Sequence, residues 1–173
     1  MNRVYQPSED TSTLARALRG YGGESCLELG FGSGAILQAL VPRFRMVVGT
    51  DILSVAQAAF AKGEVEVVLA DRATCFRDMS FDLVTFNPPY LPSENVQDTA
   101  VDGGRGGIEV PISFLREALR VVKPKGKVVL LLSDEGDIEG FREFCESKGL
   151  VVRQVASAGV FFENLLVFEI SRP

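Results

Sequence analysis

The chain has 173 residues, of which 46% are hydrophobic and 24% are charged, so it can bury the core of one globular domain without a metal ion or a disulfide to hold it. Its net charge is −5, from 18 basic and 23 acidic side chains, and this disfavours a DNA or RNA substrate, because nucleic-acid binding depends on Lys and Arg that neutralise phosphates. The chain contains no histidine, which removes the commonest general base and the commonest metal ligand.

From residue 11 onward, apolar runs alternate with helical patterns. A first helix, capped by Ser12 or Asp10, is predicted to end near Arg19. The pattern then predicts, in chain order, strand 25–29, helix 35–40, strand 46–50, helix 53–62, strands 65–69 and 81–86, helix 110–122, a turn at 123–126, strand 127–132, helix 137–148 and strands 151–157 and 164–170. The remaining segment, 87–109, is rich in Pro, Gly and Ser, which inside a compact domain indicates a functional loop.

Together these elements predict an α/β fold with a doubly wound, mostly parallel, seven-stranded Rossmann-like sheet. Strands that are apolar along their whole length are typical of parallel sheets covered by helices on both faces. No helix separates 151–157 from 164–170, so these two strands should form an antiparallel hairpin at one edge, while 65–69 should be an edge strand. No repeat or linker divides the sequence, so residues 1–173 are predicted to form a single domain.

The three cysteines are far apart and form no CxxC pair. We therefore predict no metal site, and we expect Cys26, which lies in an apolar run, to be a core residue. Unpaired cysteines fit a reducing cytoplasm. No stretch approaches the ~20 apolar residues of a membrane span, and the first residues have no signal-peptide core, so we expect no membrane association.

Ligands of open α/β sheets bind beyond the carboxyl ends of the strands, and four notable features fall at such ends. The first is the loop Gly30 to Gly34, whose glycines let the backbone approach a ligand. This signal is weak by itself, because it also fits dinucleotide enzymes or a tight turn without a ligand. Asp51 could bind ribose hydroxyls or cap the helix at 53, and Asp71 could accept a hydrogen bond from an adenine amino group or be an exposed turn residue.

Glu28 interrupts an apolar strand just before the glycine loop. Burying a carboxylate is costly unless it is paired, and a cationic ligand would supply the pairing. Methionine-derived cofactors carry an α-amino group and a sulfonium, both positive, whereas the pyrophosphate of NAD would be repelled. The alternative is that Glu28 turns to solvent at the strand end.

The fourth feature is Asn87-Pro88-Pro89-Tyr90, directly after strand 81–86. The prolines fix the backbone and leave carbonyl oxygens free, and Asn87 adds a side-chain oxygen, so two acceptors can hold a planar NH2 group. Tyr90 offers a flat face for stacking. Orientation of such a nitrogen toward a sulfonium methyl requires no ionisable base, in agreement with the absence of histidine. The alternative is an ordinary Pro-Pro turn.

These motifs, in this order and over nearly the whole chain, resemble the HemK-like class I methyltransferases, and more closely their short archaeal and eukaryotic branch. The opening Tyr5-x-Pro7-Ser8-Glu9-Asp10-Thr11 is the part most specific to that branch. The resemblance implies an enzyme that methylates the glutamine side chain in the Gly-Gly-Gln motif of class I translation release factors. It implies catalytic roles for Asn87, Pro88, Pro89 and Tyr90, and an S-adenosyl-L-methionine site formed by Tyr5, Pro7, Thr11, Glu28, Gly30, Gly32, Gly34, Asp51, Ile52, Asp71 and Asn87.

The family also bears on partners. Bacterial members have an N-terminal helical domain that binds the release factor and that this sequence does not show, so recognition is expected to use this domain itself or a partner. Some relatives pair with a small zinc-binding activator protein, for which the predicted edge strand 65–69 is the candidate contact. The stretch 102–107, rich in glycine, is expected either to lie over the substrate, with Arg105 on the substrate backbone, or to be a solvated loop.

Three rival functions remain open on the sequence. An adenine-N6 methyltransferase acting on DNA or RNA would use the same Asn87 motif, because adenine also presents a planar NH2 group, although such enzymes need phosphate contacts. An NAD-dependent oxidoreductase would share the glycine loop but leaves Glu28 and Asn87 unexplained. A non-catalytic subunit with a degenerate site is the third.

Overall fold

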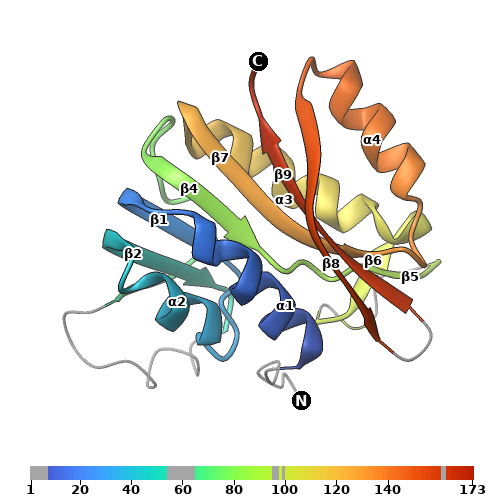
Figure 1. Ribbon diagram of the computed structural model, residues 1–173, viewed down its shortest axis with the longest axis horizontal. Coiled ribbons are helices and arrows are strands. Elements are labelled where there is room, and N and C mark those ends of the chain that lie inside the picture. Colours follow the sequence, from blue (N-terminus) through green and yellow to red (C-terminus); the bar gives the residue numbers. More distant parts are fainter. Residues whose placement is uncertain (1–7, 54–64, 95–97, 99, 161–162) are drawn as a thin grey trace.

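The computed structural model describes residues 8–53, 65–94, 98, 100–160 and 163–173. Its centre is one twisted sheet with helices on both faces (Figure 1). The strands lie in the order β3-β2-β1-β4-β7-β9-β8. Their bounds are β1 Gly23–Leu29, β2 Phe44–Asp51, β3 Glu66–Leu69, β4 Phe81–Phe86, β7 Val122–Ser133, β8 Val151–Val160 and β9 Glu163–Ser171.

The five strands from β3 to β7 pair in parallel, whereas β9 pairs antiparallel with both β7 and β8. The predicted seven-stranded sheet with an antiparallel edge hairpin is therefore confirmed. The last strand of the chain lies inside the sheet, between β7 and β8, and β8 forms one edge. The other edge is β3, as the sequence predicts.

Alternating side chains of the buried strands divide the core into two layers. Leu27 and Val84 face the layer that contains α3 (Glu109–Val121) and α4 (Ile138–Ser147). Cys26 faces the opposite layer, which contains α1 (Glu9–Ala17) and α2 (Ala35–Leu40). Cys26 is fully buried, as expected, and burial raises the pKa of its thiol to about 12.

Two predicted boundaries are wrong. Helix α1 starts at Glu9 and passes into a short 3-10 turn at Leu18–Gly20, so neither Ser12 nor Asp10 is its cap, and Asp10 lies in the first turn with its side chain buried. Strand β7 starts at Val122 because Val122 pairs with Phe81; the predicted turn 123–126 is an irregularity of the ladder within this strand. The predicted helix 53–62 falls almost wholly outside the described residues.

The segment after β4 is more ordered than a bare loop. It contains β5 (Leu91–Pro92) and β6 (Asp102–Gly104), which pair in parallel, and a 3-10 turn at Arg105–Gly107 that leads into α3. Within the part of the chain that the structure describes, no helix is long and apolar enough to cross a membrane. Because β1, β2, β3 and β4 are parallel, their carboxyl ends meet at one edge of the sheet, next to this segment.

Candidate active site

A cavity of about 660 Å³ lies at the carboxyl ends of the parallel strands, a size typical of ligand pockets. It is lined by nearly all of the predicted site residues that the structure describes: Thr11, Glu28, Gly30, Gly32, Asp51, Ile52, Asp71, Asn87, Pro88, Pro89 and Tyr90. Gly34 is not among the lining residues, and Tyr5 and Pro7 fall outside the described residues. Most of the residues predicted for one site therefore line one cavity.

The glycine loop joins β1 to α2 in a conformation that favours glycine. Gly30, Gly32 and Gly34 have φ angles of 69°, 49° and 77°. Gly34 is the N-cap of α2, so its role is to turn the chain rather than to line the cavity. The N–H of Gly30 donates to the Thr50 carbonyl over 2.7 Å, which fixes the loop against the end of β2.

The side chain of Asp51 binds the same loop through a hydrogen bond. Its Oδ2 accepts a hydrogen bond from the Gly32 N–H at 3.0 Å, and its Oδ1 accepts one from the Leu53 N–H at 2.9 Å. The second bond is the one that the helix-cap interpretation requires. The first joins β1 to β2 at the floor of the cavity and keeps the carboxylate beside the predicted cofactor, where its contact with ribose stays a prediction.

Asp71 is an exposed residue that pairs with its neighbour. Arg72 donates from Nε and Nη2 to the two Asp71 oxygens at 2.8 and 3.0 Å, and these hydrogen bonds lower the pKa of the carboxyl. The guanidinium of Arg72 also lies 5.6 Å from the centre of the Phe114 ring. Asp71 thus has the exposed-turn geometry that was one of its two interpretations, and its contact with adenine stays a prediction.

Glu28 is buried at the floor of the cavity, with a relative exposure of 3%. Its Oε2 has no hydrogen-bond partner within the described chain. Burial raises the pKa of the Glu28 carboxyl well above its usual range, the negative charge of Asp51 acts in the same direction, and the Leu37 N–H opposes them. The solvent-exposed interpretation is therefore wrong, and a cationic ligand in the cavity would supply a partner for the buried Glu28 oxygen.

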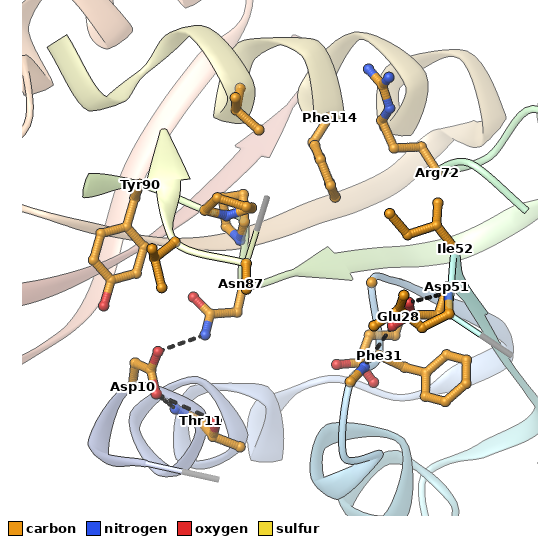
Figure 2. Close-up of a pocket in the computed structure, with 18 of the residues that line it drawn as sticks. Asp10, Thr11, Glu28, Phe31, Asp51, Ile52, Arg72, Asn87, Tyr90 and Phe114 are labelled. Carbon is orange, nitrogen blue, oxygen red and sulfur yellow. Dashed lines mark hydrogen bonds between the residues drawn. The ribbon is translucent and has the colours of Figure 1, made fainter. Parts of the chain in front are cut away.

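Asn87 presents an acceptor to the cavity. Its Nδ2 donates to Asp10 Oδ2 at 2.7 Å, while its Oδ1 is buried and has no partner among the described residues (Figure 2). A carboxylate only accepts hydrogen bonds, so Asp10 fixes which end of the Asn87 amide faces it. Asp10 is itself held by the Thr11 N–H at 2.6 Å and by the Ser8 hydroxyl. The Asn87 oxygen is therefore oriented before any substrate arrives.

Among the lining residues that the sequence analysis did not predict as site residues, Asp10, Phe114 and Glu163 are the most informative. Asp10 stands inside the opening motif, but its contact with Asn87 joins residues 77 positions apart, and nothing in the pattern pairs them. Phe114 enters from α3, where it reads as an ordinary core aromatic residue packed on Phe86. Glu163 enters from the first position of β9 with a buried, unpartnered Oε2. Of these three residues, only Asp10 could have been found from the sequence, because it lies within the opening motif.

The cavity has two ends and an acidic lining. Figure 2 shows Asp51, Ile52 and Arg72 on one side and Asp10, Asn87 and Tyr90 on the other. Among the described residues, Arg72 is the single cationic side chain of the lining, and it is paired with Asp71. The carboxylates of the lining are Asp10, Glu28, Asp51, Asp71, Asp98, Asp102 and Glu163. Such a lining favours cationic or neutral ligands over anionic ones.

Known proteins with similar sequences are methyltransferases. A family described as a methyltransferase domain matches residues 27–91. A putative protein N5-glutamine methyltransferase of Methanocaldococcus jannaschii is 30% identical over 178 residues, covering 95% of this chain and 89% of that protein. The methyltransferase HEMK2 of Homo sapiens is 29% identical over 192 residues, covering 98% and 90%.

A solved structure is similar over its whole length. It is a chain of the E. cuniculi Mtq2–Trm112 complex, described as responsible for the methylation of the eRF1 translation termination factor. It is 30% identical to this chain, with a TM-score of 0.82 and a coverage of 98% of both chains.

Proposed function

The chain belongs to the HemK2-type family of protein glutamine methyltransferases, and from that premise we propose that it transfers a methyl group from S-adenosylmethionine to a glutamine side-chain amide in the Gly-Gly-Gln motif of a class I translation release factor. The observation that carries the proposal is the buried, unpartnered Asn87 Oδ1, which Asp10 aims into the cavity. An amide nitrogen that approaches this oxygen can donate one hydrogen to it and the other to a Pro88 carbonyl.

The cofactor end suits a ligand with a cationic amino acid part. Glu28 lacks a partner for its buried Oε2, and the positive α-amino group or sulfonium of S-adenosylmethionine would provide one. Ile52 and Phe114 would lie against the adenine, and Asp51 would accept from the ribose hydroxyls. A dinucleotide fits worse, because its pyrophosphate would meet Glu28 and Asp51 beside the glycine loop.

The chemistry is a direct transfer. S-adenosylmethionine supplies a methyl group on a positively charged sulfur, and the amide nitrogen forms its new bond to that carbon while the carbon–sulfur bond breaks and leaves its electron pair on sulfur. The nitrogen then loses one proton to water. Asn87 and Tyr90 do not take that proton; they orient the NH2 group and stabilise the charge that develops on nitrogen.

The acidic lining supports a protein substrate over a nucleic acid. An adenine-N6 methyltransferase has to hold a polyanion while the base enters its pocket. Here the carboxylates of Asp10, Asp98, Asp102 and Glu163 line the cavity, and they would repel phosphates. A short peptide of glycines and a glutamine carries no such charge and is small enough to reach Asn87.

The β3 edge is the proposed docking site for a small zinc-binding activator protein. Among the described residues, no strand pairs with the outer side of β3, and Leu69 on β3 and Met46 near the start of β2 are exposed apolar side chains. The Mtq2 relative is found in a complex with Trm112. A Leu69→Asp substitution should prevent co-purification of such a partner without changing the thermal stability of the isolated chain, whereas Val151→Asp on the opposite edge should leave co-purification intact.

Because Cys26, Cys75 and Cys145 are all free thiols, the cytoplasm is the compartment we propose.

The proposal is tested with the purified protein, with and without the activator, and radiolabelled S-adenosylmethionine. The substrates are a class I release factor, the same factor with Ala in place of the glutamine of its Gly-Gly-Gln motif, and DNA and RNA oligonucleotides. Label is expected on the first factor alone. Label on nucleic acid, or equal label on the Ala variant, would contradict the proposal.

A further inference from the structure

The glycine-rich stretch 102–107 lies directly against the main chain of the Asn87 motif. The chain leaves β4 through the motif, forms β5, and returns as β6 (Figure 1). The Leu91 N–H donates to the Val101 carbonyl at 3.0 Å, and the Ser93 N–H donates to the Gly104 carbonyl at 3.0 Å. These two hydrogen bonds hold the returning segment against Leu91 and Ser93, directly after Tyr90.

The contact with Tyr90 is closer than any side chain allows. A Cβ atom added to Gly103 would lie 2.7 Å from the Cα and the carbonyl carbon of Tyr90, and also 2.7 Å from the Gly107 carbonyl oxygen. A Cβ atom on Gly107 would collide with the Tyr90 carbonyl oxygen. Real Cβ atoms essentially never approach other atoms so closely, and the obstacle here is backbone rather than a flexible side chain. Both positions therefore require glycine for a steric reason.

The far side of the segment is anchored to two helices. The Gly106 carbonyl accepts a hydrogen bond from the Asp137 N–H at 2.8 Å, and Asp137 is the N-cap of α4, where its side chain accepts from the Gly140 N–H. The Arg105 N–H donates to the Glu109 carboxylate of α3 at 3.2 Å. Arg105 itself is exposed and lies outside the main cavity.

We propose that residues 102–107 are a rigid support that fixes the position of the Tyr90 backbone, and through it the acceptors of the Asn87 motif, relative to the methyl group. The segment is thus a positioning element, and Gly103 and Gly107 are its contact points. The expected effect of the segment on the reaction rate rests on the proposed function, whereas its expected effect on the position of Tyr90 does not. A displacement of the reacting groups by about 1 Å is enough to lower a rate by about 10²-fold.

Gly103→Ala is the sharpest test, because Gly103 does not have a positive φ, so the added methyl group acts through its contacts with the Tyr90 main chain and the Gly107 carbonyl oxygen and not through backbone strain. We expect kcat on the release factor to fall by about 10²-fold. The affinity for S-adenosylhomocysteine should stay within about twofold, since the cofactor end does not touch this segment. Gly107→Ala should behave similarly but also lose stability, because Gly107 has a φ of 68°.

Gly149→Ala is the matched control. Gly149 has a φ of 67° with no atom within 4 Å of the added Cβ, so the substitution strains the backbone without touching Tyr90. It should lower the melting temperature and leave kcat unchanged. A kcat loss in Gly149→Ala equal to that in Gly103→Ala would show that general destabilisation explains both.

A crystal structure of Gly103→Ala provides a readout that is independent of the substrate. The Tyr90 main chain is expected to move away from residue 103 while residues 104–107 keep their contacts with α3 and α4. If Tyr90 stays in place and the glycine segment moves instead, the segment is not rigid and the proposal is overturned. Absence of activity in the unsubstituted protein would overturn the proposed function but not this result.

Discussion

At the Glu28 end of the cavity, polar side chains come from the strands themselves or directly after them, whereas the Asn87 end is assembled from segments far apart in the chain. Glu28 is the next-to-last residue of β1 and Asp51 is the last residue of β2, and the parallel pairing of these strands is enough to bring the two side chains together. Asn87 is oriented by Asp10 and supported through Tyr90 by Gly103, and Glu163 of β9 lines the same cavity.

The contrast suggests a division of tasks. The Glu28 end contains a buried carboxylate oxygen without a partner in the described chain, and the Asn87 end contains a buried amide oxygen without one; Glu163 adds a second such carboxylate oxygen to the lining of the cavity. A charged acceptor suits a cation, and a neutral acceptor held in one orientation suits an NH2 group. If the division holds, substitutions at one end change cofactor affinity and those at the other end change kcat.

The largest effect is expected from Asn87→Ala. The substitution removes the oriented acceptor while leaving the strand-end residues unchanged, and loss of one such pre-organised hydrogen bond costs about 10³-fold in kcat. Steady-state kinetics on the release factor measure the loss, and calorimetry with S-adenosylhomocysteine should show an affinity within about twofold of the parent. A comparable loss of cofactor affinity would mean that the two ends are not separate.

Glu28→Gln should act on the other end. Loss of a hydrogen bond between charged groups costs about 2 kcal/mol, which corresponds to a roughly 30-fold weaker affinity for S-adenosylmethionine. At saturating cofactor, kcat should stay within a few-fold of the parent. Glu24→Gln is the control, because Glu24 is an exposed residue at the opposite end of the same strand, and it should change neither quantity.

The same residue predicts a pH dependence with a definite sign. Because burial raises the pKa of the Glu28 carboxyl, the group binds a proton in the free protein at pH values where an exposed glutamate has lost it. Pairing with a cation requires the ionised form, so cofactor affinity should rise with pH up to that pKa and then level off, with up to one proton released per cofactor bound. Calorimetry in buffers of different ionisation enthalpy measures the release, which Glu28→Gln should abolish.

The difference between the two ends also explains what could be read from the sequence. The strands and their order along the chain follow from apolar runs, and Glu28, Asp51 and Asn87 stand out because each is a polar residue where such a run ends. The orientation of Asn87 by Asp10 and the fit of Gly103 on Tyr90 could not be predicted, since both are contacts in space between separate segments. Glu163 starts a strand that turns back antiparallel, so nothing in its neighbours marks it as a cavity residue.

Asp10→Asn tests the long-range part of the site. The Asp10 carboxylate accepts from Asn87 on one oxygen and from the Thr11 N–H on the other, so an amide at residue 10 must turn an NH2 group toward one of these donors. When it faces Asn87, the Asn87 amide is driven to flip and to present its own NH2 group to the substrate. We expect kcat to fall by about tenfold with unchanged cofactor affinity. The neighbouring exposed Glu9, changed to Gln, should have no effect; equal losses in both variants would point to a general disturbance of α1.

The smallest effect is expected from Phe114→Leu, which tests where the boundary between the two ends lies. Phe114 lines the cavity from α3 and carries Arg72 on its face, so a bound adenine would lose about 1 kcal/mol of aromatic contact, or roughly fivefold in the KM for S-adenosylmethionine, with kcat unchanged. Phe141→Leu is the matched control: Phe141 is a fully buried residue of α4 that does not line the cavity, so it should lower the melting temperature and leave KM alone. If Phe114→Leu instead lowers kcat at saturating cofactor, the Phe114 ring contacts the substrate and not the cofactor, and Ile52 is then the last residue of the cofactor end.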